Sequence, residues 1–327
     1  MNAPRAAPQP PPPGSPIPGG ARIVDRGYRR YDGPRTGVSG AMRSLVRSTA
    51  QRTLGIHRKF RFKVLPVMVI LMTYLPAMVF VGITVLFNRL ATGEEGGPPT
   101  EQFARPVVES LISSFAAYYG FVIAAIVLFA AFIAPDVLCT DRKTGMLGLY
   151  LASPLNRVTY LLSKGAAVMM LLLMVTLGPT LLMLIGYATQ GFGPSGASDW
   201  FSTIGQLIVA GIGVAAFHTL ISMAISSFTT RRAAASAAFT MLVVGSGSVL
   251  TFLLQNEALS SEWGMLNVLT LPRDFTFRIF GQEPDLFSPL GGPALMPTWA
   301  VYVGMAGWMV VSLSVIADRY RRAQVTK

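Results

Sequence analysis

Charged side chains are scarce in this sequence. Lys, Arg, Asp and Glu make up only 13% of its 327 residues, against about 25% in an ordinary soluble domain, while 52% of the residues are hydrophobic. Six intervals of 24 or more residues contain no charge at all. About 20 apolar residues suffice for a helix that crosses a bilayer. The sequence therefore predicts an all-α polytopic membrane protein with six transmembrane helices, at about 64–88, 110–135, 165–189, 204–229, 233–255 and 296–317.

Residue types that carry chemistry are also scarce. Cys139 is the one cysteine, so no internal disulfide can form. His57 and His218 are the two histidines, which excludes a zinc or bis-histidine haem site built from the spans. The phosphate loop G-x-x-x-x-G-K-[ST] is missing from the sequence, and so is the dipeptide Gly-Lys. We therefore expect a chain that is not an enzyme, does not hydrolyse ATP by itself and binds no cofactor or metal.

His218 is the one group within the six uncharged intervals that could act as a proton relay. Ser222 follows it by one helical turn. Two interpretations remain open at this point. His218 is either a neutral side chain that is hydrogen-bonded inside the helix bundle, or a residue that lines a transport pathway.

The distribution of charge predicts the orientation. If the N-terminal segment, the second and fourth loops and the C-terminus share one side, that side holds 23 of the 27 basic residues and five acids. The other side holds four basic residues and ten acids, so the net charges are +18 and −6. Cytoplasmic loops collect Lys and Arg, so both termini are expected in the cytoplasm. The membrane is expected to be the plasma membrane, which in bacteria is the inner membrane. The excess positive charge follows topology, and it needs no nucleic-acid partner.

Two segments precede the six-helix domain at 63–320. Residues 1–40 are predicted to be a disordered cytoplasmic tail, because the first 20 residues contain eight prolines. Residues 41–62 are predicted to form a basic amphipathic helix along the membrane surface. This helix is either an anchor whose cations meet anionic lipid or a lever that touches a cytoplasmic partner. Its apolar face comprises Met42, Leu45, Val46, Thr49, Thr53, Ile56 and Phe60, and its polar face Arg43, Arg47, Gln51 and Arg58.

The last outer loop, at 256–295, is too apolar to float freely in water and too interrupted to span a membrane. Pro272, Gly281 and Pro284 divide it with turn signals. We expect it to fold as short helices against the outer rim of the bundle.

The second cytoplasmic loop, at 136–164, is the most informative segment. Gly145 is expected to break the chain direction, and residues 146–152 are long enough for two helical turns. Ser153 is expected to cap the next helix, with Pro154 at its first position.

The short helix in this loop is apolar although it lies at the cytoplasmic surface. Such a helix has to dock, either onto its own bundle or onto a partner, and local physics leaves both open. Its large apolar side chains are Leu147, Leu149, Tyr150 and Leu151.

Here the sequence resembles a family, the permease subunits of type 2 ABC exporters. After their second span these permeases have Glu-Arg-x-x-Gly-Thr, a short helix that ends in a small residue and Pro-Leu, and then Gly-Lys or Ser-Lys. In this chain Asp141 stands for the Glu, and Met146 and Gly148 depart from the pattern. The matching positions are Arg142, Gly145, Ser153, Pro154, Leu155, Ser163 and Lys164, with Arg157 after the corner. The six spans, the cytoplasmic termini and the amphipathic helix extend the resemblance over residues 41–320.

The resemblance implies a mechanism. Two permease subunits, in a homodimer or a heterodimer, would pair around a translocation path, and each loop helix would sit in a groove of a separate ABC ATP-binding subunit that holds ATP and Mg. The residues it implies for coupling are Asp141, Arg142, Gly145, Leu147, Leu149, Tyr150, Leu151, Pro154, Arg157 and Lys164.

Two other classes of function remain open. One is a membrane anchor or assembly factor that recruits a cytoplasmic protein without transport, and the other is a secondary carrier, which the uncharged spans disfavour. The sequence assigns neither the transported substrate nor the direction of transport.

Overall fold

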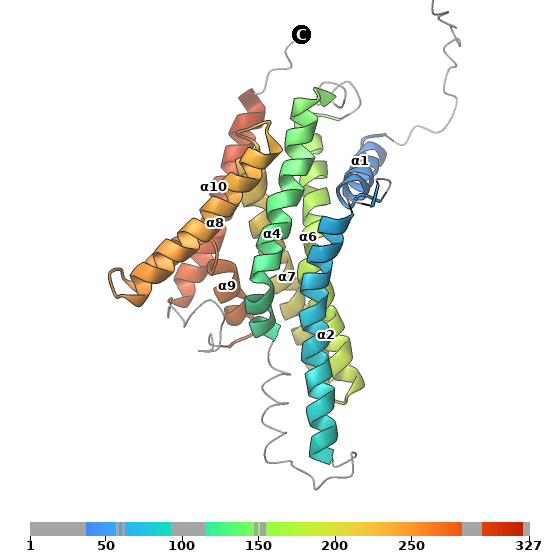
Figure 1. The fold of residues 1–327 in the computed structure, drawn as a ribbon, viewed down its shortest axis with the longest axis vertical. Coiled ribbons are helices and arrows are strands. Elements are labelled where there is room, and N and C mark those ends of the chain that lie inside the picture. Colours follow the sequence, from blue (N-terminus) through green and yellow to red (C-terminus); the bar gives the residue numbers. More distant parts are fainter. Residues whose placement is uncertain are drawn as a thin grey trace, which may run out of the picture. The chain divides into compact units, whose positions relative to one another are not determined.

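The fold was analysed in a computed structural model, which describes residues 37–56, 59–60, 63–92, 115–146, 150, 155–282 and 296–322. Across these residues the secondary structure is helical, without strands (Figure 1). Six of the helices are long and apolar enough to cross a membrane. This confirms the predicted all-α polytopic class. The six are α2 (Val64–Thr92), α4 (Phe115–Lys143), α6 (Arg157–Thr189), α7 (Ala197–Ser226), α8 (Arg232–Gln255) and α10 (Thr298–Arg322).

Helix α4 is at the centre of this bundle. It packs against α2, α6, α7 and α8, and Figure 1 shows it running between α8 on one side and α2 and α6 on the other. Two buried tyrosines tie it to its neighbours, because Tyr118 donates to the carbonyl of Thr73 at 2.9 Å and Tyr119 to that of Thr176 at 3.2 Å. Polar groups at membrane depth need partners inside the protein. These bonds therefore fix α4 against α2 and α6.

Helix α1 (Gly37–Thr53) packs along α6 and touches α4. Its apolar side is buried at Leu45 and Ala50, while Arg43 and Arg47 are exposed, as the predicted amphipathic pattern requires. The helix begins at residue 37 and ends at 53, so it is displaced from the expected range of 41–62. Gly55, with φ of 69°, turns the chain after the last helical residue. The expected face is therefore interrupted there.

Residues 256–282 contain the 3₁₀ helix η2 (Ser261–Leu266) and helix α9 (Leu271–Ile279). They lie deeper than the rim position expected from the sequence. The ring of Phe275 lies against Gly213, near the middle of α7, and Leu269 lies against Gly247 of α8. Glycine allows these close approaches because it has no Cβ. The pair η2 and α9 thus enters the bundle between α7, α8 and α10.

One end of the bundle gathers α1, the C-terminal ends of α4, α7 and α10, and the N-terminal ends of α6 and α8. We call it the basic end, because it carries Arg52, Arg142, Lys164, Arg231, Arg232, Arg319 and Arg321. The sequence assigns the same end to the cytoplasm.

Candidate functional site

The candidate site begins at the C-terminal end of helix α4. This helix continues to Lys143, beyond the expected end at residue 135. Pro135 lies inside the helix, where neighbouring helices can satisfy the backbone groups that it leaves free. Residues 136–143, which are predicted to belong to the loop, are thus part of helix α4. Gly145, with φ of 68°, then turns the chain, as expected.

The second part of the site is the start of α6, and here the prediction from Ser153 and Pro154 is wrong. The helix begins at Arg157, with Asn156 as its N-cap. The Asn156 side chain accepts from the Thr159 N–H at 2.8 Å, and the Thr159 hydroxyl accepts from the Asn156 N–H at 2.8 Å. This reciprocal capping box satisfies two backbone donors at once, and it places the cap three residues after the expected cap, Ser153.

Asp141 lies between these two helices and is fully buried. One of its carboxylate oxygens, Oδ2, lies 2.6 Å from Nζ of Lys164 and accepts from the Tyr160 hydroxyl at 3.1 Å. The other, Oδ1, accepts from Nη2 of Arg52 at 3.1 Å. A buried carboxylate is tolerable when it is paired and hydrogen-bonded in this way. Asp141 therefore joins α4 to α6 and to α1.

Lys164 is also almost fully buried, and its ammonium group has further partners. Nζ donates to the Thr49 hydroxyl of α1 at 3.1 Å, and it lies 5.3 Å from the ring centroid of Tyr150 and 5.7 Å from that of Tyr160. Burial raises the pKa of the Tyr150 hydroxyl, the charge of Asp141 raises it further, and Arg52 opposes both effects. Tyr150 is thus a neutral aromatic side chain, which suits its position beside a buried cation.

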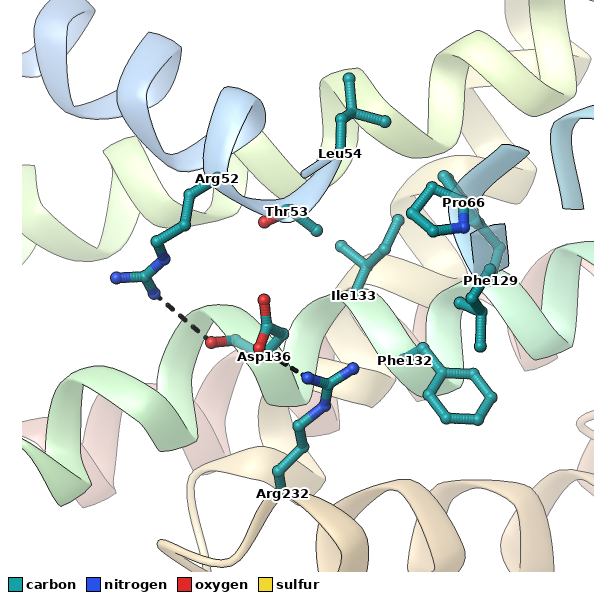
Figure 2. Close-up of a pocket in the computed structure, with 10 residues that line it drawn as sticks. Arg52, Thr53, Leu54, Pro66, Phe129, Phe132, Ile133, Asp136 and Arg232 are labelled. Atoms are coloured by element: carbon teal, nitrogen blue, oxygen red, sulfur yellow. Dashed lines mark hydrogen bonds and ion pairs between the residues drawn. The ribbon is translucent and has the colours of Figure 1, made fainter. Parts of the chain in front are cut away.

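A second carboxylate on α4 extends the network. Nη1 of Arg232, from the start of α8, lies 2.9 Å from Oδ1 of Asp136. Arg52 also reaches this residue, since its Nη2 donates to the Asp136 carbonyl oxygen at 3.5 Å. Figure 2 shows the two arginines converging on Asp136 from α1 and α8. The residues drawn there line a small cavity, whose volume is about 60 Å³.

Arg142 completes the connections of α4. Its guanidinium donates to the carbonyl oxygens of Ser227 and Thr229, in the turn between α7 and α8. The end of α4 is thereby bonded to α1, α6, α8 and the α7–α8 turn. We call this set of side chains the α4 hub, and it consists of Thr49, Arg52, Asp136, Asp141, Arg142, Tyr150, Tyr160, Lys164 and Arg232.

The α4 hub is suited to holding helices together. Both oxygens of Asp141 are engaged by donors, so this carboxylate is not placed to act as a general base. Burying these charges costs several kcal/mol per ion, and attraction between the partners offsets that cost only in a precise geometry. The hub therefore specifies how the helices meet.

The structure brings part of the predicted set together. Asp141, Arg142, Tyr150 and Lys164 are members of the hub, and Gly145 makes the turn between them. Arg157 lies apart from the hub, where its Nη1 donates to the Arg321 carbonyl oxygen at 3.0 Å. The other predicted coupling residues, Leu147, Leu149, Leu151 and Pro154, lie outside the described residues.

Five members of the hub were not among the predicted site residues: Thr49, Arg52, Asp136, Tyr160 and Arg232. A signal for some of them was present in the sequence. Asp136 and Asp141 are the only acids between residues 110 and 198, and they stand at the end of an apolar span. Acids in such a position need cationic partners, although the sequence does not say which.

His218 lies in the packed interior of α7 and is fully buried. Its Nδ1 is 2.8 Å from the Val214 carbonyl oxygen of the same helix, and its buried Nε2 has no hydrogen-bond partner among the described residues. His218 lines neither the cavity in Figure 2 nor the larger hollows beside α8 and α10 that are described below. The burial and the Nδ1 contact fit the first interpretation, a side chain hydrogen-bonded inside the bundle, although Nε2 does not take part in such a bond among the described residues.

Fold and site together define a multi-pass, all-α membrane protein whose central helix ends in a buried ion-pair network. The chain belongs to the family described as "Protein of unknown function (DUF2705)", whose family model matches residues 102–326. The match covers α4 to α10 and so includes most of the α4 hub, while α1 and α2 precede it. A comparison with curated proteins finds no match.

Proposed function

We propose that this chain is the permease subunit of an ATP-driven ABC transporter of the exporter class, coupled to a separate ATP-binding subunit. The observation that carries the proposal is the buried ion pair between Asp141 and Lys164. These residues occupy the two ends of the segment that resembles the coupling segment of type 2 ABC permeases. A loop closed by such a pair can pass force to both flanking helices.

The path of that force runs through the α4 hub. Displacement of the loop moves Asp141 on α4 and Lys164 on α6 together, because their charges are buried and paired with each other. Arg52 transmits the same displacement to α1. The packing of α1 on α6 favours the lever interpretation of this helix over that of a simple lipid anchor.

A second permease subunit fits the face formed by α2, α4 and α8. In the most apolar stretch of each helix, 22% of the residues of α2 and 17% of those of α8 are buried. The corresponding share for α4, which lies between them, is 72%, so α2 and α8 leave most of their apolar side chains uncovered. A cavity of about 590 Å³ opens between α4 and α8, lined by Phe132, Ser236, Thr240 and Met241 among others. Ser236 Oγ is buried without a hydrogen-bond partner among the described residues. Pairing of two subunits over this face would enclose the cavity as part of a translocation path.

In this proposal ATP and Mg are bound by the partner subunit, and this chain supplies the path and the coupling surface. The basic end faces the cytoplasm of the cell, and the protein resides in the plasma membrane, in bacteria the inner membrane. The positive charge of this end agrees with that orientation.

The test is to uncouple the two subunits. Under this proposal a neighbouring gene should encode a P-loop ATPase. The chain is co-expressed with that candidate, and ATPase activity and ATP-dependent export are measured in reconstituted complexes. Leu149→Asp or Tyr150→Asp should abolish export and the stimulation of ATPase activity by the permease. Thr230→Asp, at an exposed position of the same basic end, is the matched control and should leave both unchanged. Normal export by both loop variants would refute the coupling assignment, and partner binding without transport would favour the membrane-anchor function.

A further inference from the structure

A groove opens on the other side of the bundle, between α6, α7 and α10. Its volume is about 670 Å³, within the range typical of ligand sites. Small residues make the hollow, among them Gly165, Ala166, Ala216 and Ala317. At its rim the side chains of Leu162 and Leu313 are more than half exposed, on the surface of the spans that lipid would cover.

The groove has the length of one leaflet. On α6 it extends from Arg157 to Met169, which at 1.5 Å per residue is about 18 Å. Half of the hydrocarbon core of a bilayer measures about 15 Å. The groove therefore begins at the basic end and reaches about as deep as a single acyl chain does.

The charged side chains that line the groove are confined to its mouth, and Thr219 is a polar lining residue beside Met169 at the deeper end. Arg157 and Arg321 line the mouth, and the bond from Arg157 Nη1 to the Arg321 carbonyl oxygen holds them together.

Tyr320 also lines the groove, is 5% exposed, and has a buried hydroxyl without a hydrogen-bond partner among the described residues. Asp318, the nearby acid of α10, is not one of the lining residues. The mouth thus offers two cations, whereas the buried Tyr320 hydroxyl is influenced by the charges of Arg142 and Asp141.

We infer that this groove binds one anionic phospholipid from the leaflet at the basic end. The phosphate group lies between Arg157 and Arg321, and an acyl chain fills the hollow. Basic pockets between transmembrane helices are a recurrent way to bind anionic headgroups. The bound lipid braces α10 against α6 close to the α4 hub, since the ring of Tyr320 lies 6.4 Å from that of Tyr160. The inference does not depend on the proposed transport function.

The test uses the full-length chain reconstituted in bilayers that contain brominated lipid. A reporter, Leu162→Trp, places a fluorophore at the rim, and the unmodified chain gives the background from the native tryptophans. Brominated phosphatidylglycerol should quench the reporter more strongly than brominated phosphatidylcholine. Each arginine should contribute a preference of about fivefold for the anionic lipid. Equal quenching by the two lipids would overturn the inference.

Variants locate the headgroup and the chain. In the reporter background Arg321→Gln or Arg157→Gln should lower the preference about fivefold. Arg231→Gln removes an exposed arginine from the same end but outside the groove, so it should leave the preference unchanged. Ala317→Leu should reduce quenching by both lipids, because it fills the hollow. Size-exclusion profiles verify that each variant is folded, and an unchanged preference in both folded arginine variants would refute the headgroup assignment.

Competition with inorganic phosphate distinguishes a site for a whole phospholipid from a site for a free phosphate ion. Because the groove binds the acyl chain as well, millimolar phosphate should not restore fluorescence in bilayers with brominated phosphatidylglycerol. Full displacement by phosphate would show that the site binds a free anion, and it would overturn the assignment to a lipid.

Discussion

Asp141 and Lys164 form a buried ion pair with an oxygen–nitrogen distance of 2.6 Å, although they belong to two different helices that a loop connects. Asp141 belongs to the last turn of α4 and Lys164 to the third turn of α6. The pair therefore closes the loop at its base, and Arg52 adds α1 to the same contact. Removing either charge should therefore weaken the contacts that join α4, α6 and α1.

The first prediction concerns the loss of this charge. Asp141→Asn keeps the size of the side chain but leaves Lys164 buried without its counter-ion. Removing one partner of a buried pair typically costs about 3–5 kcal/mol of unfolding free energy. We expect a loss of this size in thermal or denaturant unfolding of the purified protein. The double variant Asp141→Asn with Lys164→Met should recover part of the loss.

The pair of Asp136 with Arg232 is the matched control. The side chain of Arg232 is 49% exposed and that of Asp136 is 11% exposed. The side chains of Lys164 and Asp141 are 1% and 0% exposed, so water screens the control pair more. Arg232→Gln should therefore cost less unfolding free energy than Asp141→Asn. If Arg232→Gln were as destabilising as Asp141→Asn, burial would not be what distinguishes the two pairs.

The class of fold was readable from the sequence because the bilayer imposes it. Long intervals without charge fix where a helix can cross, and the six predicted spans follow from that requirement. The end of α4 was not readable in the same way. Residues 136–143 carry charges that would normally end a span, and they remain helical because Asp136 and Asp141 have partners on other helices.

The candidate site was predicted in part. The motif positions Asp141 and Lys164 were identified by resemblance, but their contact with each other was not. Arg52 was missed because it lies between the apolar and polar faces of α1, and Tyr160 because a tyrosine in a span is usually a packing residue. Such partners depend on tertiary contacts, which no local pattern in a single sequence encodes.

The second prediction concerns the start of α6. Asn156→Ala removes the side chain that accepts from the Thr159 N–H. Loss of an N-cap typically costs about 1 kcal/mol, whereas Asp or Ser at the same position retains an acceptor. We expect Asn156→Ala to lower the unfolding free energy by about that amount, and Asn156→Ser to remain near the parent value. Equal stability of all three proteins would mean that Asn156 is not the cap.

The third prediction concerns the insertion of α9. A Cβ at Gly213 would overlap the ring of Phe275, so Gly213→Ala must displace α9 or the ring. Overpacking of this kind costs about 1–3 kcal/mol. Gly205, on the same helix, has open space where a Cβ would lie, so Gly205→Ala should be neutral or slightly stabilising. Phe275→Leu should partly rescue Gly213→Ala, and a Gly213→Ala variant as stable as Gly205→Ala would contradict this packing.

The fourth prediction concerns Asp274 of α9, which is 4% exposed. Burial raises the pKa of this carboxyl, and the nearby Arg273 and Arg278 only partly oppose the effect. A pKa that is higher in the folded state means that folding favours the protonated form. The stabilising contribution is therefore complete below the ordinary value of 3.8 and is lost as the pH rises through the folded-state pKa.

The measurement is the melting temperature of the parent protein and of Asp274→Asn as the pH is lowered from about 7 to about 4. Asn resembles the protonated carboxyl and does not titrate. The parent protein should gain stability relative to the variant as the pH falls. A difference that stays constant across this range would show that the pKa of Asp274 is not raised by folding.

The last prediction concerns which end of the bundle faces the cytoplasm. It is tested by cysteine labelling, because Cys139 is the one cysteine of the sequence and is easily replaced. Cys139→Ser gives a background without thiols, to which single cysteines are added at two surface positions. Ser195→Cys lies in the turn between α6 and α7, opposite the basic end, and Thr230→Cys lies in the turn between α7 and α8. A membrane-impermeant maleimide applied to intact cells should label the cysteine at 195, and it should label the cysteine at 230 only after permeabilisation. Both should react fully in detergent, which controls for accessibility. The reverse pattern in intact cells would place the α4 hub outside the cytoplasm, where no ATP-binding subunit could reach it.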